Sequence, residues 1–341
     1  MTRHSQIAVL IASLLASSGT LSLAGQNMPK SHAQVMFDLP ARCQLGQTCW
    51  VANYVDVDPS PAAKDFHCQA RTYDGHDGVD VAIRDRRVME QGVSVLAAAP
   101  GIVRRIRDGV EDVGLANPAS REAIAGRECG NGVVIDHGNG WETQYCHLKQ
   151  RSVRVTVGQQ VEPGEELGLI GLSGKTEFPH VHFTVRHAGH VVDPFTGRSN
   201  AAGCGSKGQA LWRDPNVSYE DVALYHMGFS AGEPQIDAVR AGKAEAERLP
   251  ADSPTLVLWV EIFGVQATDW LGFRITGPDG HILLEHERQI ARTQARHFAY
   301  AGLRRPSRQW PAGLYRGEVQ FRRARGDNRL TRRHTNAVQV P

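Results

Sequence analysis

The chain has 341 residues, and its 38 Lys and Arg against 36 Asp and Glu give a formal net charge of only +2. A charge so close to neutral gives no reason to expect a nucleic-acid partner. At roughly 100 to 200 residues per domain, the length is sufficient for two domains that each have a core.

The N-terminus has the pattern of a secretory signal peptide. Arg3 and His4 precede an apolar run over 7–16, and the small-x-small triplet Ser22-Leu23-Ala24 follows it. We therefore predict a signal peptide over 1–24 and an exported protein, located in the periplasm or, as the alternative, secreted. The alternative is an uncleaved membrane anchor. The run is shorter than the ~20 apolar residues of a bilayer-spanning helix, and no later stretch reaches that length, so no transmembrane span is expected after signal removal.

The six cysteines are an even number, which fits a disulfide framework in an exported protein better than free thiols or a cysteine metal site. Cys129 and Cys146 flank a predicted hairpin and could face each other across its strands. The next pairing in rank is Cys43 with Cys49, which leaves Cys68 with Cys204 by elimination.

Glycines and short alternating apolar segments dominate from about 35 to 194 and predict a mainly antiparallel β domain, for which we take the bounds 25–205. Its clearest strands are expected within Val95–Ile106, in a hairpin over Gly132–Leu148, in Val153–Gly171 and in His180–Arg186. A stretch of more helical composition, between Arg107 and Cys129, interrupts the sheet. It is either a functional lid or a decoration.

The sequence of residues 206–341 predicts a connector followed by a second β unit. Residues 206–253 are expected to be a helical connector, because Gln235–Leu249 is rich in Ala, Glu, Lys and Arg at helical spacing. Residues 254–341 contain alternating strands, of which Thr255–Val265 is the first, and the turn Gly277–Gly280. Their spacing predicts a small β-sandwich of immunoglobulin-like type.

Charge is unevenly distributed in this second unit. The stretch from Arg288 to Arg333 contains 13 arginines against two acidic residues, Glu318 and Asp327. Such a stretch is usually a solvated face. The functional alternative is contact with an anionic wall or membrane surface.

Two short motifs carry the chemistry of the first unit. His76-Asp77-Gly78-Val79-Asp80 has the pattern H-x-G-x-D, and its glycines indicate a turn that enters a strand, where imidazole and carboxylate can converge. In His180-Val181-His182 the period of two places both imidazoles on one face of a strand. Each motif alone is weak, since H-x-x-x-D is usually a surface turn and H-x-H is often a packing pair. Their occurrence in one exported β domain favours a metal site.

Two His and one Asp give a metal three N/O ligands and leave a fourth position for water, as in a catalytic zinc site. The candidate ligands are His76, Asp80 and one histidine of the pair, with the other free to act as acid or base. His147, at the end of the returning hairpin strand, is the next candidate. Alternation along that strand predicts that Tyr145 shares the face of His147 and that Cys146 points to the opposite side.

Residues from about 35 to 195 resemble the M23 peptidases, the lysostaphin-like or LytM-type family. The resemblance rests on the H-x-G-x-D motif, on the segments 95–103 and 130–140, on Thr143–Leu148, on Ser173-Gly174 before Pro179–Phe183, and on Val192-Asp193-Pro194. It implies that His76, Asp80 and His182 bind one zinc ion and that His147 and His180 polarise the substrate or water. Tyr73 is a further possible oxyanion donor, although the family's tyrosine position is not clearly matched.

The resemblance implies a metalloendopeptidase that hydrolyses peptide cross-links of peptidoglycan. The competing hypothesis is a catalytically silent protein that binds the envelope and activates another wall hydrolase, as some relatives of this type have lost ligands. An intact set of ligands and histidines favours activity. A third hypothesis is a secreted peptidase that acts on other proteins.

Overall fold

The computed structural model describes residues 1–2, 35–115, 122 and 124–341. The predicted signal peptide, apart from its first two residues, lies outside the described residues, as does most of the segment 116–123 in the predicted insertion. Residues 35–341 form one compact unit. Within the described ranges, no helix combines the length and the apolar composition that a bilayer crossing requires.

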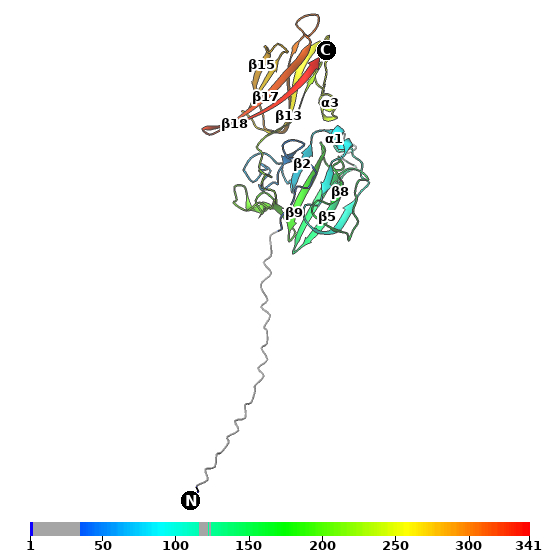
Figure 1. The fold of residues 1–341 in the computed structure, drawn as a ribbon, viewed down its shortest axis with the longest axis vertical. Coiled ribbons are helices and arrows are strands. Elements are labelled where there is room, and N and C mark those ends of the chain that lie inside the picture. Colours follow the sequence, from blue (N-terminus) through cyan, green and yellow to red (C-terminus); the bar gives the residue numbers. More distant parts are fainter. Residues whose placement is uncertain (3–34, 116–121, 123) are drawn as a thin grey trace. The chain divides into compact units, whose positions relative to one another are not determined.

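The first part of this unit is an antiparallel sheet (Figure 1). Its strands lie in the order β1 (Cys49–Asn53), β2 (Val79–Ile83), β9 (His180–His187), β6 (Trp141–Leu148), β5 (Asn131–Gly138), β4 (Gly101–Arg107) and β7 (Gln160–Val161), while β10 (His190–Asp193) pairs with β9 and with β11 (Arg198–Ser199). The connecting elements are α1 (Arg86–Gln91), a separate pair of β3 (Ser94–Leu96) with β8 (Glu166–Leu169), and the short 3-10 helix η1 (Asn200–Ala202).

Alternation along the central strands separates a core face from a functional face. Val181 and Phe183 of β9 pack in the hydrophobic core with Val81 of β2 and Tyr145 of β6, and all four are essentially inaccessible to solvent. His180 and His182 therefore project from the opposite face of β9. The mainly β, antiparallel fold predicted for this region is confirmed.

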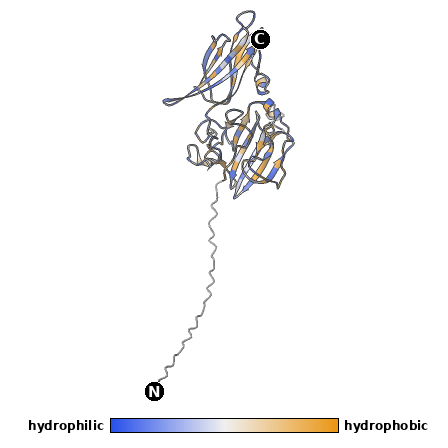
Figure 2. Ribbon diagram, in the orientation of Figure 1, coloured by the Kyte–Doolittle hydropathy of each residue, from blue (hydrophilic) through white to orange (hydrophobic). Residues whose placement is uncertain are grey.

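The C-terminal part is a sandwich of two antiparallel sheets. One sheet has the order β12 (Ala223–Ser230), β13 (Thr255–Val265) and β16 (Gln294–Arg304), and the other β15 (Ile282–Gln289), β14 (Trp270–Thr276), β17 (Gly313–Arg325) and β18 (Asn328–Val340). Both sheets contribute to one core, in which Leu258 and Val260 lie with Phe273 and Phe321. Hydropathy alternates along several of these strands (Figure 2), as the burial of one face requires. The predicted second β domain is confirmed, and its immunoglobulin-like type stays a prediction.

The predicted helical connector over 206–253 is wrong for most of its length. Its described helix is the short α3 (Ile236–Arg240), and β12 within the same range pairs with β13 as a strand of the sandwich. Pro234 precedes α3 and Gly242, with a φ of 72°, follows it, which limits the helix to little more than one turn. Beyond α3 the backbone forms hydrogen bonds to strands of the sandwich and not within a helix, as when the Leu249 amide donates to the carbonyl of Gln339 in β18.

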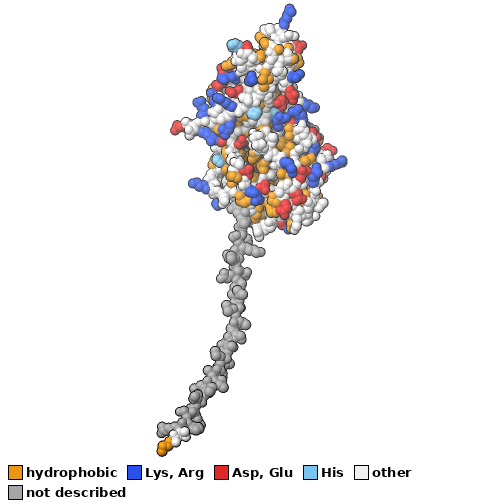
Figure 3. Space-filling view, in the orientation of Figure 1, with side chains coloured by type: hydrophobic (Ala, Val, Ile, Leu, Met, Phe, Trp, Pro, Cys, Tyr) orange, Lys and Arg blue, Asp and Glu red, His pale blue; other side chains and the backbone are white. Residues whose placement is uncertain are grey.

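Four of the 13 arginines in the 288–333 stretch have acidic partners, namely Arg296, Arg322, Arg323 and Arg325. Arg322 pairs with Glu287 at 2.6 Å, and buried Arg323 pairs with Asp269 at 2.7 Å. On the face shown in Figure 3, basic and acidic side chains are interspersed over this region. The pairing reduces the charge that the stretch can offer to a partner, so contact with an anionic envelope stays a prediction.

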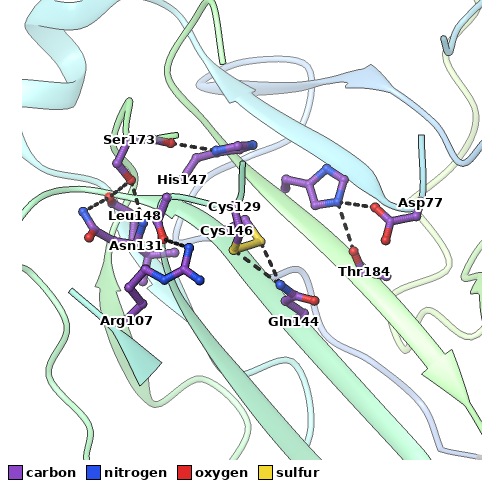
Figure 4. The surroundings of a disulfide bond; sticks show 12 residues. Asp77, Arg107, Cys129, Asn131, Gln144, Cys146, His147, Leu148, Ser173 and Thr184 are labelled. Atoms are coloured by element: carbon purple, nitrogen blue, oxygen red, sulfur yellow. Dashed lines mark hydrogen bonds and ion pairs between the residues drawn. A yellow bond between two sulfur atoms is a disulfide. The ribbon is translucent and has the colours of Figure 1, made fainter. Parts of the chain in front are cut away.

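The three disulfides have the predicted connectivity. Cys129 bonds to Cys146, and Cys43 to Cys49 and Cys68 to Cys204 complete the set. The Cys129–Cys146 disulfide joins the segment before β5 to β6, beside the functional face (Figure 4).

Candidate functional site

The two predicted motifs meet on the functional face of the sheet. Asp80 of β2 is the register partner of His182 in β9, and His182 is in turn opposite Cys146 in β6. His76 precedes β2 and reaches the same point. A groove of about 240 Å³ lies over this row, lined by Tyr73, Asp77, Glu128, Cys129, Gln144, Cys146, His147, Lys175, His182, Thr184 and Arg186.

His76, Asp80 and His182 form a tight cluster of donor atoms. Their candidate ligand atoms all lie within 4.8 Å of one another, and all three residues are buried. The Nε2 of His76 is 3.1 Å from Oδ1 of Asp80 and 3.1 Å from Nδ1 of His182. Nδ1 of His182 is 2.9 Å from Oδ1 of Asp80.

Backbone and side-chain acceptors fix which ring nitrogen of each histidine faces the cluster. The Nδ1–H of His76 donates to the carbonyl of Tyr54 at 2.7 Å, so its Nε2 carries the inward lone pair. His182 has the reverse orientation, because its Nε2 faces Asp77 and Thr184 at 3.0 Å. The second oxygen of Asp80 accepts from the Asn53 side chain at 2.8 Å, which leaves Oδ1 at the cluster.

The remaining two predicted histidines lie beside this cluster. The Nδ1–H of His180 donates to the Phe178 carbonyl at 2.9 Å, and its Nε2 is 3.2 Å from Oδ1 of Asp80. The Nδ1–H of His147 donates to the Ser173 carbonyl at 2.8 Å (Figure 4), so its Nε2 is unengaged by that bond. The ring centroids of His147 and His180 are 4.7 Å apart.

The predicted alternation along β6 is wrong at its end. Tyr145 lies in the core, whereas both Cys146 and His147 line the groove. His147 has a φ of 63°, a left-handed conformation that interrupts the alternation of side chains and turns its imidazole to the functional face. Non-glycine residues in this region store strain, and they concentrate at functional sites.

Burial and neighbouring charged groups together shift the pKa values of Asp80, His147 and His182. Burial disfavours the ionised form of Asp80, but the imidazoles of His76 and His180 hold the pKa of its carboxyl well below its usual range. Burial also lowers the pKa of His147 well below its usual range, and His180 and His182 contribute to this shift. For His182, burial is outweighed by Asp77 and Asp80, which raise its pKa to about 9.

The donor set fits a metal ion. Two imidazole nitrogens and a carboxylate oxygen converge, and each ligand is oriented by an outer partner, as is usual at metal sites. Cysteine does not close the set, since all six cysteines are in disulfides. Three protein ligands with an open side toward a groove are typical of a catalytic rather than a structural centre.

Sequence reasoning missed several residues around the groove. Asp77, Thr184 and Arg186 support His182 from the side away from Asp80, and only the adjacency of Asp77 to the first motif gave a signal for them. Tyr73, by contrast, was predicted as a possible oxyanion donor; it is half exposed, and its ring centroid is 4.5 Å from that of His76. The described end of the insertion contributes Glu128 to the groove, so the insertion forms part of the wall of the site.

An antiparallel sheet that carries a buried His-Asp-His donor set and two further histidines beside a groove has the features of a metallopeptidase centre. Residues 74–194 match the model of Peptidase family M23, so the chain contains a domain of this family and the predicted resemblance is confirmed.

Part of the chain is also similar to curated proteins. Over 137 residues the chain is 31% identical to the DD-carboxypeptidase/endopeptidase Mpg of Neisseria meningitidis, covering 40% of this chain and 25% of that protein. Over 64 residues it is 41% identical to the peptidoglycan DD-endopeptidase ShyA of Vibrio cholerae, covering 19% of this chain and 14% of that protein. The chain thus spans a quarter or less of the length of these relatives. A solved M23 peptidase structure from Pseudomonas aeruginosa aligns with 48% of this chain and 49% of its own, at 25% identity and a TM-score of 0.29.

Proposed function

We propose that this protein is an exported, zinc-dependent endopeptidase that hydrolyses peptide cross-links of bacterial peptidoglycan in the periplasm. The observation that carries the proposal is the convergence of His76, Asp80 and His182 beside two further histidines in an M23 domain. Two relatives, named as a DD-endopeptidase and a DD-carboxypeptidase/endopeptidase, support the substrate class.

His76 would hold one zinc ion through Nε2, His182 through Nδ1 and Asp80 through Oδ1. Imidazole and carboxylate are ordinary zinc ligands, and their number leaves room for water and substrate. The chemistry that zinc supplies is a lowered pKa for bound water and polarisation of a carbonyl.

His147 and His180 would handle protons and developing charge. The Nδ1–H of each is held by a backbone carbonyl, so Nε2 is the nitrogen left for acid–base work. Burial keeps His147 neutral, and a neutral ring can accept a proton at Nε2. His147 lines the groove, whereas His180 lies deeper, within reach of Asp80. We assign His147 to take a proton from the attacking water at Nε2 and to deliver it to the leaving amine. A ring that carries this proton has an Nε2–H with which to stabilise the oxyanion, a role that we assign to both histidines.

Purified peptidoglycan provides the test. We expect the protein to release peptide-linked fragments, to lose this activity with a metal chelator and to regain it when zinc is added back. Mass spectrometry of the fragments identifies the bond that is cut. A fully zinc-loaded, folded protein that releases nothing, yet stimulates another wall hydrolase, would replace the proposal with the regulatory alternative. Faster cleavage of soluble Gly-rich protein than of cell wall would show that the substrate is protein and not peptidoglycan.

A further inference from the structure

Asp77 lies between two parts of the site, the turn that delivers His76 and the outer edge of the His182 ring. Its Oδ1 is 3.0 Å from Nε2 of His182, on the opposite side of the ring from the atom that faces Asp80. A carboxylate oxygen can only accept at this distance, so the bond requires a proton on Nε2 of His182.

A second set of contacts holds Asp77 itself. Arg186 donates from Nη2 to Oδ2 of Asp77 at 2.9 Å and from Nη1 to Oε1 of Gln144 at 2.7 Å. Gln144 in turn lies against the Cys129–Cys146 disulfide. The Asp77 side chain, although 43% exposed, is thus anchored to β6 and β9 and not only to its own turn.

Figure 4 shows the surroundings of the disulfide, with Asp77, Gln144 and Thr184 among the residues drawn. Asp77 and Thr184 lie together on one side of the Cys129–Cys146 bond, and His147 lies on the other. Thr184 Oγ1 is 3.0 Å from the same Nε2, so it is a second, uncharged acceptor for the same proton.

We propose that Asp77 is a positioning residue for His182. Its carboxylate accepts the Nε2–H of His182 and holds the ring so that Nδ1 faces His76 and Asp80, where it would bind a metal after losing its own proton. Asp77 is itself kept in place by Arg186. The inference rests on the proposed function, because it assigns the purpose of this orientation to metal binding. Outer carboxylates of this kind typically contribute 10- to 100-fold in metal affinity.

The experiment compares zinc affinity, by competition with a chromophoric chelator, for the wild type, Asp77→Ala, Asp77→Asn and Arg186→Gln. We expect Asp77→Ala to bind zinc about 10- to 100-fold more weakly. Asp77→Asn keeps an uncharged acceptor, so its zinc affinity should lie between those of the wild type and Asp77→Ala. Arg186→Gln should lose less zinc affinity than Asp77→Ala. The matched control is Asp136→Ala, which removes an aspartate paired with Arg104 at 2.6 Å on β5 and should leave the affinity unchanged.

Nitrogen-15 NMR supplies a readout that does not depend on zinc. The Nε2–H of His182, assigned by its loss in His182→Ala, should be visible and slow to exchange in the wild type and should exchange faster in Asp77→Ala. Zinc affinity within threefold of the wild type in Asp77→Ala overturns the inference. So does a raised KM with unchanged affinity, which would make Asp77 a substrate contact. A wild type that binds no zinc but shows the protected Nε2–H would instead overturn the proposed function and leave the hydrogen bond established.

Discussion

Gly78 lies directly against the imidazole of His182. A Cβ added at position 78 would be 2.6 Å from Nε2 of His182 and 2.8 Å from the carbonyl oxygen of Phe183, closer than side-chain carbons approach such atoms. The φ of Gly78 lies outside the left-handed region that Gly75 occupies at 74°. The glycine of the H-x-G-x-D motif is therefore needed for close packing of the turn on β9 and not for a special backbone angle.

Replacing Gly78 by Ala should displace the His182 ring, because the contact with the Phe183 carbonyl cannot yield. We expect lower zinc content and lower wall-digesting activity in a protein that still folds, as judged by circular dichroism. Gly232→Ala is the control, since a Cβ there meets no atom within 4 Å. Full zinc occupancy in Gly78→Ala would show that the turn can shift without disturbing the ligand.

His147, His180 and His182 should differ in what is lost when each is replaced by Ala. His182→Ala removes a ligand and should lower both zinc content and activity. His180→Ala and His147→Ala should retain zinc while losing the ~100- to 10,000-fold that a positioned acid–base or oxyanion group supplies. Zinc content and digestion rate are measured on the same purified samples.

Zinc content discriminates between His180 and His182 as the third ligand, because both rings approach Oδ1 of Asp80, at 3.2 Å and 2.9 Å. Loss of zinc in His180→Ala with retention in His182→Ala would reverse the assignment. Activity in all three variants would place the reaction elsewhere in the chain.

Much of the site could be predicted from sequence because its parts depend on local periodicity. The period of two in His180-Val181-His182 is sufficient to place both rings on one face, and Val181 is in the core as this requires. The hairpin spacing of Cys129 and Cys146 similarly predicts their bond. Alternation failed at His147 because a positive φ at a non-glycine residue has no signature in sequence.

Other features depend on contacts between distant segments. Asp77 and Arg186 are 109 positions apart, and only the pairing of β2 with β9 brings them together. The helical composition around Gln235–Leu249 predicted a helix, but tertiary bonds to the sandwich overrode this propensity, as when the Ala246 amide donates to the Phe229 carbonyl.

The Cys129–Cys146 disulfide should contribute to both stability and activity. It closes a loop with a sequence separation of 17, for which chain entropy predicts about 3 kcal/mol of stability. Its neighbour His147 donates its amide to the Cys129 carbonyl at 2.8 Å, so loss of the bond should also loosen this ring. We expect the double variant Cys129→Ala with Cys146→Ala to unfold at lower denaturant concentration and to digest wall more slowly.

The control for this experiment is Cys43→Ala with Cys49→Ala, which opens a disulfide of sequence separation 6 at the start of β1. It should cost about 2 kcal/mol of stability by the same relation and leave the rate per folded molecule unchanged. Equal losses of activity in the two double variants would argue against a specific effect on His147.

Asp193, at the end of β10, should make stability depend on pH. It is fully buried, its Oδ1 accepts from the Phe195 amide at 2.7 Å, and its Oδ2 has no hydrogen-bond partner among the described residues. Burial raises the pKa of its carboxyl from 3.8 to about 7. The native protein therefore holds this proton more tightly than the unfolded chain. The contribution of Asp193 to stability is complete below pH ~4 and is lost as the pH rises through about 7.

Replacing Asp193 by Asn should remove this dependence, because the amide keeps the acceptor for Phe195 and cannot ionise. The wild type should lose up to about 4 kcal/mol more than Asp193→Asn between pH 4 and pH 8, since each unit of pKa shift corresponds to about 1.4 kcal/mol. The measurement is the free energy of unfolding in urea at several pH values for both proteins, and the difference between the two curves isolates this carboxyl from the other titrating groups. Parallel curves would show that Asp193 ionises at its ordinary pKa in the native state, as it would if water reached Oδ2. A difference that instead grows as the pH falls below 4 would reverse the sign and indicate a carboxylate stabilised by the fold.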